Sequence, residues 1–371
     1  MATATSMPLQ PRLSSIPHPS SSDVRQRGEV ENTSPGPAQA AFPLLALAMA
    51  EFQAGAVRKT LRRGCALRGK SAVSEPRAAR ANGGMHMDGQ FDRTAEDLGN
   101  IVALEHVNLA VPDQQFATLY YIAGLGLTRD PYLMTSVSNM WVNAGRSQFH
   151  LPTSPGQVLR GHVGIVLPDR ETLVKRLMRL RKRLDGTRFD FHEHESFVET
   201  TCPWGNRIRC HFPESNNGAM RLGIAYVEFT VPMGAADGIA RFYRETMRTP
   251  AATAEDREGR YAQIPVGIGQ QFIFRETARE IPAYDGHHVQ VYVADFSGPH
   301  RALEEKGLIS EESDQHQYRF KDIADPETGA VLFTIEHEVR SMRHPLFMRP
   351  LVNRNPMQNN MNYITGHDAW S

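Results

Sequence analysis

The sequence has few cysteines and no long apolar run, and both absences limit what the chain can be. Its three cysteines, Cys65, Cys202 and Cys210, form no C-x-x-C pair. Neither a disulfide framework nor a zinc ribbon is therefore indicated, and a reducing compartment fits best. The longest strongly apolar stretch near the start, residues 41–50, is about half the roughly 20 residues that span a bilayer. We expect no transmembrane helix.

An excess of one charge and the common nucleotide-binding loops are also missing. Lysine plus arginine and aspartate plus glutamate number 41 each, so the formal net charge is zero. Balanced charge gives no general reason to expect nucleic acid or a membrane surface as partner. No G-x-G-x-x-G, P-loop or nucleophile elbow stands in a convincing context, which argues against nucleotide-dependent and serine-hydrolase chemistry. The expected partner is a small-molecule substrate, and a homo-oligomer is left open.

Residues 1–98 differ in composition from the rest of the chain. Serine, proline, alanine and arginine dominate them, and no helix or strand period persists, so we expect disorder. Residues 1–15 and 57–73 are rich in hydroxyl groups or arginine and poor in acids, which is typical of an organelle transit peptide. The alternatives are a low-complexity tail or a misassigned start, because Met85 and Met87 shortly precede the first strand. The protein is thus expected to be soluble and intracellular, either cytoplasmic or in a plastid or mitochondrion.

From residue 100 onward the chain repeats itself at intervals of about 60 residues. The repeated segments are "LEHVNLAVPD" from Leu104, "GHVGIVLPD" from Gly161, "IAYVEFTVP" from Ile224 and "HHVQVYVAD" from His287. Each alternates with period two, as a strand does. One face is aliphatic or aromatic and should pack on a core. The other face is polar or small and can line a cavity; it includes His106, His162, Glu228, His288 and Tyr292.

Helical patterns and shorter alternating runs follow these strands, most clearly the helical patterns at 170–184 and 238–247. Each unit therefore has the order β-α-β-β-β, and the predicted fold class is α+β. The four units span residues 101–156, 159–214, 221–278 and 284–338. Pairing consecutive units predicts one domain over 99–215 and another over 221–340, followed by a C-terminal tail over 341–371.

Paired βαβββ units with a histidine at the head of the first strand resemble the vicinal oxygen chelate superfamily. That group includes glyoxalase I, extradiol dioxygenases and bleomycin resistance proteins. The motifs that carry the resemblance are "HVNLAVPD", "GHVGIVLPD", "CPWGNRIRCHF" and "DPETGAVLF". The resemblance implies cupped, antiparallel-rich sheets. It also implies a divalent metal held by side chains of the first strand, the fourth strand, the first strand of the next unit and the final strand.

In the first pair of units, the resemblance assigns those places to His106, His150, His162 and Arg209. Arg209 stands where the family usually has a glutamate, and a cation cannot ligate a metal. Three neutral imidazoles can nevertheless hold iron, manganese, zinc or copper. A metal-free vestigial pocket is the alternative. Arg209 could hold a carboxylate or phenolate of an anionic substrate.

In the second pair of units, the corresponding places fall on Tyr226, Ile273, His288 and Phe333. Three of these are not ordinary ligands, so this domain is expected to lack a metal. Extradiol dioxygenases of this length carry iron in their C-terminal domain, so the departure puts ring cleavage in doubt. Glu228, His288 and Tyr292 could still act as acid-base groups. A buried hydrogen bond between Glu228 and His288 is the structural alternative.

The leading functional hypothesis is a metal-dependent enzyme that acts on a small, oxygenated, anionic organic molecule. Dioxygenase and glyoxalase-type lyase or isomerase chemistry both remain open within it. The alternatives are a metal-free protein that sequesters a ligand, as resistance proteins of this fold do, and an oligomeric scaffold.

Overall fold

The computed structural model describes residues 93–131, 138–213, 220–351, 357 and 363–364. The proposed transit peptide and alternative start lie within residues 1–92, outside the described residues. A short 3-10 helix, Arg93–Glu96, falls inside the segment expected to be disordered. One turn closed by a hydrogen bond from the Asp97 N–H to the Thr94 carbonyl leaves no periodic pattern in the sequence. Among the described residues, no helix combines the length and apolarity needed to cross a membrane.

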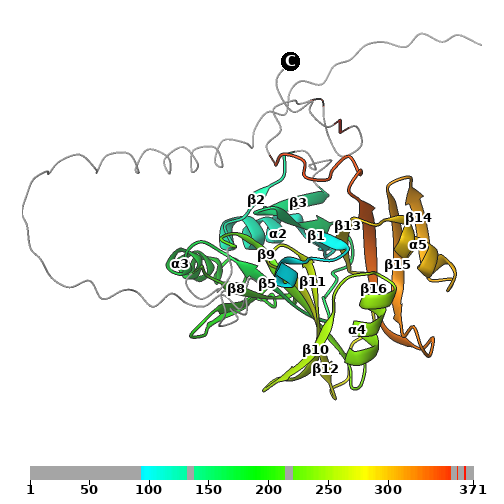
Figure 1. Ribbon diagram of the computed structural model, residues 1–371. Coiled ribbons are helices and arrows are strands. Elements are labelled where there is room, and N and C mark those ends of the chain that lie inside the picture. Colours follow the sequence, from blue (N-terminus) through cyan, green and yellow to red (C-terminus); the bar gives the residue numbers. More distant parts are fainter. Residues whose placement is uncertain (1–92, 132–137, 214–219, 352–356, 358–362, 365–371) are drawn as a thin grey trace, which may run out of the picture. The chain divides into compact units, whose positions relative to one another are not determined.

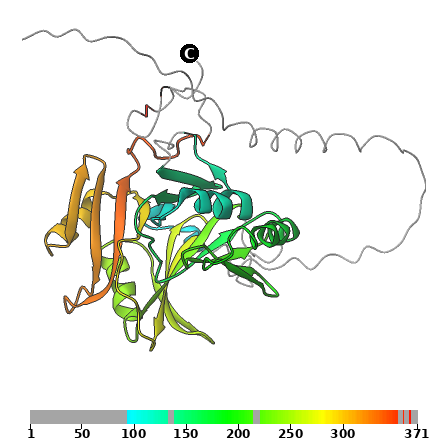
Figure 2. The same cartoon turned by 180° about the vertical axis from the view of Figure 1, so that it is seen from behind.

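The described residues form two eight-stranded sheets with few helices, which confirms the α+β class (Figures 1 and 2). The strand order is β14-β15-β16-β13-β1-β4-β3-β2 in the first sheet and β10-β11-β12-β9-β5-β8-β7-β6 in the second.

Four βαβββ units supply these strands. The first unit contains β1 (Ile101–Asn108), α2 (Gln114–Ala117) continued by the π-helix Thr118–Gly124, β2 (Thr128–Arg129), β3 (Asn139–Ala144) and β4 (Ser147–Pro152). The second contains β5 (Gly161–Val166), α3 (Arg170–Leu180), β6 (Asp190–Glu193), β7 (Val198–Thr201) and β8 (Arg207–His211). The third contains β9 (Gly223–Pro232), α4 (Ala236–Glu245), β10 (Ala252–Asp256), β11 (Gly259–Gly267) and β12 (Gln270–Thr277). The fourth contains β13 (His288–Val293), α5 (Ser297–Glu304), β14 (Ile309–Asp314), β15 (Gln317–Ala324) and β16 (Val331–Ser341).

All four units share one internal topology. The fourth strand of each unit pairs parallel with the first, and the remaining neighbours within the unit are antiparallel. Units are then joined by antiparallel pairing of their first strands, β1 with β13 and β5 with β9. The first unit therefore shares a sheet with the fourth, and the second shares a sheet with the third.

This pairing differs from the consecutive pairing expected from the sequence. Strand alternation fixes which residues share a face, but it does not select the strand that will meet an open edge. Contacts between units determine which strand pairs with the free edge of each first strand, and a single sequence does not reveal these contacts.

The apolar faces of the first strands pack into one continuous core, as their alternation predicted. Val107, Val163, Val227 and Val289 occupy equivalent places and are all buried in it. Helix α4 contributes to this core and packs against β11 of one sheet and β15 of the other (Figure 1). Its buried positions include Ile239.

One side chain ties the two sheets together at their centre. The carboxamide of Gln270 accepts a hydrogen bond from the Leu104 N–H at 3.0 Å and donates to the Leu104 carbonyl at 2.9 Å. Its Nε2 also lies 3.0 Å from Ser147 Oγ and 3.1 Å from the Ile224 carbonyl. A buried amide bonded on both sides fixes the relative position of β1, β4, β9 and β12.

Candidate metal centre

The polar face of the first sheet carries two rows of side chains across β4, β1, β13 and β16. The first row contains His150, Asn108, His288 and Glu336, and the second contains Gln148, His106, Gln290 and Glu338. Residues in register, and alternate residues of one strand, point to the same face of a sheet. The β1–β13 pairing has an approximate two-fold relation, under which His106 corresponds to His288 and His150 corresponds to Glu338.

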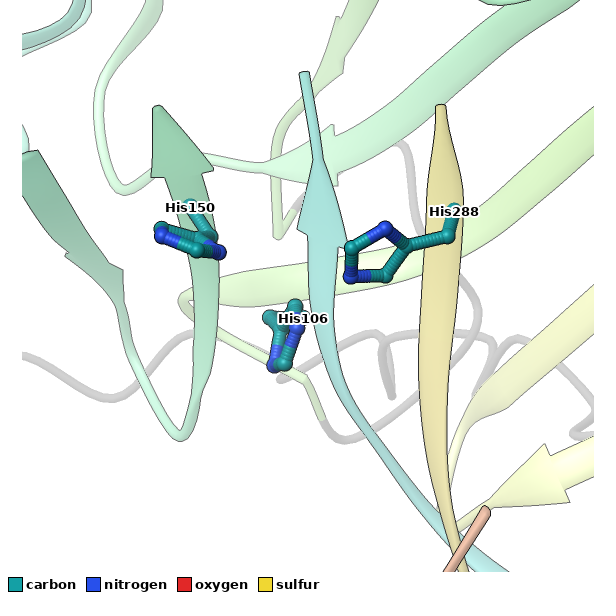
Figure 3. A group of neighbouring side chains, drawn as sticks. All are labelled: His106, His150 and His288. Carbon is teal, nitrogen blue, oxygen red and sulfur yellow. The ribbon is translucent and has the colours of Figure 1, made fainter. Parts of the chain in front are cut away.

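Three imidazoles meet on this face. His106, His150 and His288 each offer a ring nitrogen, and these three atoms lie within 4.8 Å of one another. The ring centroid of His106 is 5.9 Å from that of His150 and 5.8 Å from that of His288. Figure 3 shows the rings on neighbouring strands, with His106 between the other two. Among the described residues, no other group of three or more histidine, cysteine, aspartate or glutamate side chains has this geometry.

The rings of His106 on β1 and His150 on β4 each have a polar partner for one ring nitrogen. His106 Nδ1 lies 3.4 Å from Glu105 Oε2, and His150 Nε2 lies 2.8 Å from Asn139 Oδ1. In the tautomers that donate to these oxygens, His106 Nε2 and His150 Nδ1 keep their lone pairs. Metal-binding histidines are commonly held by such partners.

Unpartnered nitrogens support a fit to a metal ion. His106 Nε2 and His288 Nε2 are buried and have no hydrogen-bond partner among the described residues. A buried ring nitrogen without a partner is uncommon. Three neutral imidazoles with free lone pairs match the donor sets of zinc, iron and manganese sites. The residues present therefore fit a divalent transition metal.

A fourth oxygen donor lies beside the cluster. Glu338 Oε2 is 3.6 Å from His288 Nε2, and the carboxylate is buried. Arg340 contacts Glu338 Oε1 at 2.6 Å, and Arg319 contacts its other oxygen. Burial opposes ionisation, but the positive charges of Arg340 and Arg319 and the contact with His288 hold the pKa of Glu338 well below its ordinary value. The ionised carboxylate completes a candidate set of three nitrogens and one oxygen.

Two histidines of this cluster, His106 and His150, are poor bases in the folded protein. Burial lowers the pKa of His106 despite the opposing effect of Glu105. Burial and the two neighbouring imidazoles hold the pKa of His150 well below its ordinary value. Both rings are therefore neutral at neutral pH, which is the form that ligates metals.

The C-terminal tail lies against this region of the sheet. Trp141 stacks on His150, with 3.9 Å between the ring centroids and 14° between their planes. Leu346 and Tyr363 pack on the same tryptophan in a small apolar cluster. Phe347 contacts the ring of Tyr292 at a centroid distance of 4.8 Å. The described tail residues thus border the candidate metal centre.

His162 does not join the cluster, because β5 belongs to the second sheet. On that sheet it lies opposite Glu228, with 3.8 Å between His162 Nδ1 and Glu228 Oε1. The equivalent ligand places on the second sheet are His162, Arg209, Tyr226 and Ile273. Tyr226 packs over Gly164, where an added Cβ would come within 2.1 Å of the ring. These four places hold one imidazole; a second, His211, lies on β8 with its Nε2 3.0 Å from the Tyr226 hydroxyl, and the described residues of this face form no group of three such donors.

The remaining predicted site residues are divided between the two sheets. Arg209 Nε lies 3.1 Å from Glu199, and Arg275 Nε lies 3.2 Å from Glu228, both on the second sheet. The expected pair of Glu228 and His288 is therefore not formed. Tyr292, on the first sheet, donates from its hydroxyl to Glu105 at 3.1 Å. Through that carboxylate it supports the orientation of His106.

Glu338 was missed because the resemblance placed the last family position of the second pair of units at Phe333. Strand β16 is 11 residues long, and its parallel pairing with β13 places Glu338 beside Gln290. The usable signal was the alternation of Glu336, Glu338 and Arg340 on one side of that strand. Their charges mark the polar face that continues past Phe333.

No protein-family model and no curated protein matches the sequence. Solved structures do match. Glyoxalase I from Zea mays has a TM-score of 0.47 at 12% identity, over 64% of this chain and 92% of that one. A 2,3-dioxygenase from Pseudomonas sp. KL28 has a TM-score of 0.25 at 12% identity, over 66% and 93% of the two chains. A variant of 4-hydroxymandelate synthase from Streptomyces coelicolor has a TM-score of 0.25 at 14% identity, over 65% and 92%.

The βαβββ units that the sequence predicted, and from which the resemblance was drawn, are present in the structure. The chain folds into four βαβββ units that are paired through their first strands into two mixed sheets. At 12–14% identity and TM-scores below 0.5, these likenesses leave the reaction open.

Proposed function

We propose that this protein is a metal-dependent enzyme acting on a small oxygenated organic substrate, with His106, His150 and His288 as metal ligands. The observation that carries the proposal is the convergence of three ring nitrogens within 4.8 Å on one buried sheet face. Glu338 is the proposed fourth ligand. This donor set fits iron, manganese or zinc. It replaces the set of His106, His150 and His162 that was expected from the sequence.

A bound divalent ion would supply Lewis acidity toward a carbonyl or enolate oxygen, or a site for dioxygen. The side chains of this face hold and orient the ligands. Glu105 accepts from Tyr292 and lies 2.9 Å from Arg340 Nη1, so its position beside His106 is fixed from two sides. Burial opposes its ionisation, but His106 and Arg340 keep the pKa of Glu105 below its ordinary value.

An anionic substrate group was expected to bind Arg209, which lies on the other sheet, and the guanidiniums of Arg319 and Arg340 on this face are already paired. Arg319 contacts Glu336 and Glu338, and Arg340 contacts Glu105 and Glu338. Paired guanidiniums have little remaining capacity for a second carboxylate. The proposal therefore keeps an oxygenated substrate and does not require a negative charge on it.

The test compares turnover by the full chain loaded separately with Fe(II), Mn(II) and Zn(II). Oxygen uptake measured with an electrode would indicate a dioxygenase, whereas product formation without oxygen uptake would indicate a lyase or isomerase. We expect His288→Ala to abolish turnover and His162→Ala, the same change on the other sheet, to retain it. Loss of turnover in His162→Ala alone would contradict the proposal.

A metal-free binding protein or a scaffold predicts a different result. Such a protein needs a pocket or a surface but no ion, so a chelator would leave its ligand binding intact. The convergence of His106, His150 and His288 favours the enzyme over these alternatives.

A further inference from the structure

Two carboxamides lie among the proposed metal ligands and have unsatisfied polar atoms. Gln290 is fully buried, and neither its Nε2 nor its Oε1 has a hydrogen-bond partner among the described residues. Asn108 Oδ1 is also buried without a partner, and its Nδ2 makes one long contact, 3.4 Å to Gln157. Buried amides are nearly always hydrogen-bonded in native proteins.

Strand register places both amides on the face that holds the imidazoles. Gln290 is flanked by His106 on β1 and by Glu338 on β16. Asn108 is flanked by His150 on β4 and by His288 on β13. The approximate two-fold relation of the β1–β13 pair makes the two amides equivalent, one on either side of the candidate metal centre.

A buried amide that forms no hydrogen bond destabilises the fold, because on folding it loses its hydrogen bonds to water and gains none in return. A leucine of similar size would not have this cost. Gln263, on the second sheet, shows the usual arrangement, since it donates to Gln271 at 2.7 Å. The polar atoms of Gln290 and Asn108 are therefore available to a ligand bound at the cluster.

We propose that Gln290 and Asn108 form a hydrogen-bonding pair that orients the substrate and selects an uncharged hydroxyl group next to its carbonyl. The proposal rests on the proposed function and deepens it by naming the substrate class, hydroxycarbonyl compounds. A carboxamide offers both a donor and an acceptor. The amide oxygen can accept a hydrogen bond from a hydroxyl group. An ionised carboxylate has no proton to donate, so it cannot form this hydrogen bond.

The experiment uses the Co(II)-loaded full chain and two small probes, hydroxyacetone and pyruvate. They differ in having a hydroxymethyl group or a carboxylate next to the same carbonyl. Binding is followed through the visible absorption of Co(II), and Co(II) affinity is measured separately. The variants are Gln290→Leu and Asn108→Leu, with Gln263→Leu as the matched control on the other sheet.

We expect Gln290→Leu to weaken hydroxyacetone binding about tenfold, the effect of losing one or two hydrogen bonds. Pyruvate binding should change less, so the ratio of the two affinities falls. Co(II) affinity should stay within about threefold of the wild-type value, since the amide is not a ligand. The Tm of the metal-free protein should rise, because an unpaired buried amide is removed. Asn108→Leu should show the same pattern, and Gln263→Leu should leave the ratio unchanged.

An unchanged affinity ratio in both Gln290→Leu and Asn108→Leu would overturn the pair while leaving the metal proposal standing. A lower Tm for metal-free Gln290→Leu would also count against it, since it would show that the amide is hydrogen-bonded within the fold. Failure of the wild-type protein to bind Co(II) would overturn the metal proposal and this inference together.

Discussion

The buried ion pair between Asp130 and Arg349 anchors the C-terminal tail beside the candidate metal centre, and its removal should be costly. Arg349 Nη2 lies 2.6 Å from Asp130 Oδ2, and the two side chains are 2% and 0% exposed. Gln148 donates to the same carboxylate oxygen at 2.7 Å. Arg349→Met keeps most of the apolar stem but leaves the buried carboxylate without its guanidinium. Breaking one half of a buried pair costs about 3–5 kcal/mol.

Urea denaturation of the full chain measures this loss as a change in unfolding free energy. The double variant Asp130→Asn with Arg349→Met should be destabilised by less than the sum of the single variants, because both charges of the pair are then removed together. Lys175→Met is the control, since Lys175 and Glu171 are 61% and 77% exposed, and its effect should be about 0–1 kcal/mol. A loss below about 1 kcal/mol for Arg349→Met would refute the reasoning.

Three further predictions follow from the two sheet faces. Asn139→Ala removes the partner that orients His150 and should weaken metal affinity about 10–100-fold in a competition titration with a chelator; an unchanged affinity would show that the contact is dispensable. Burial, together with Arg209 and other nearby cations, lowers the pKa of His162 from 6.5 to about 2. Because the folded-state pKa lies below the unfolded one, stability is lost as pH falls below 6.5, by about 1.4 kcal/mol per pH unit. Urea titrations between pH 6.5 and 4.5 should show that extra slope in the wild type relative to His162→Gln, and equal slopes would contradict the assignment. Gly164→Ala should destabilise the protein by about 1–3 kcal/mol, because the added Cβ would collide with the Tyr226 ring. Gly186→Ala is not a suitable control, because Gly186 has a positive φ that alanine rarely adopts. A thermal melt of Gly164→Ala equal to that of the wild type would exclude the clash.

The fold class and the order of elements within each unit could be predicted from the sequence, because each first strand repeats the same alternation. Val107 and Val289 could be assigned to the core, and His106 to the polar face, from period two alone. Helices α3 and α4 were also recognisable from the helical patterns at 170–184 and 238–247.

The composition of the candidate site could be predicted only in part, because it depends on which units share a sheet. His106 and His150 lie on β1 and β4 of one unit, so their proximity follows from the unit itself. The third imidazole depends on the partner of β1. With consecutive pairing it would be His162, but the observed β1–β13 pairing makes it His288. Pairing between distant units reflects tertiary contacts, which local patterns do not encode.

Metal content tests the central claim most directly. Mass spectrometry on the full chain, purified without a histidine tag, should find near-stoichiometric iron, manganese or zinc in the wild type. His162→Ala should retain that metal, whereas His106→Ala and His288→Ala should lose it. Retention of metal in His288→Ala with its loss in His162→Ala, or no metal in the wild type even after reconstitution, would contradict the account.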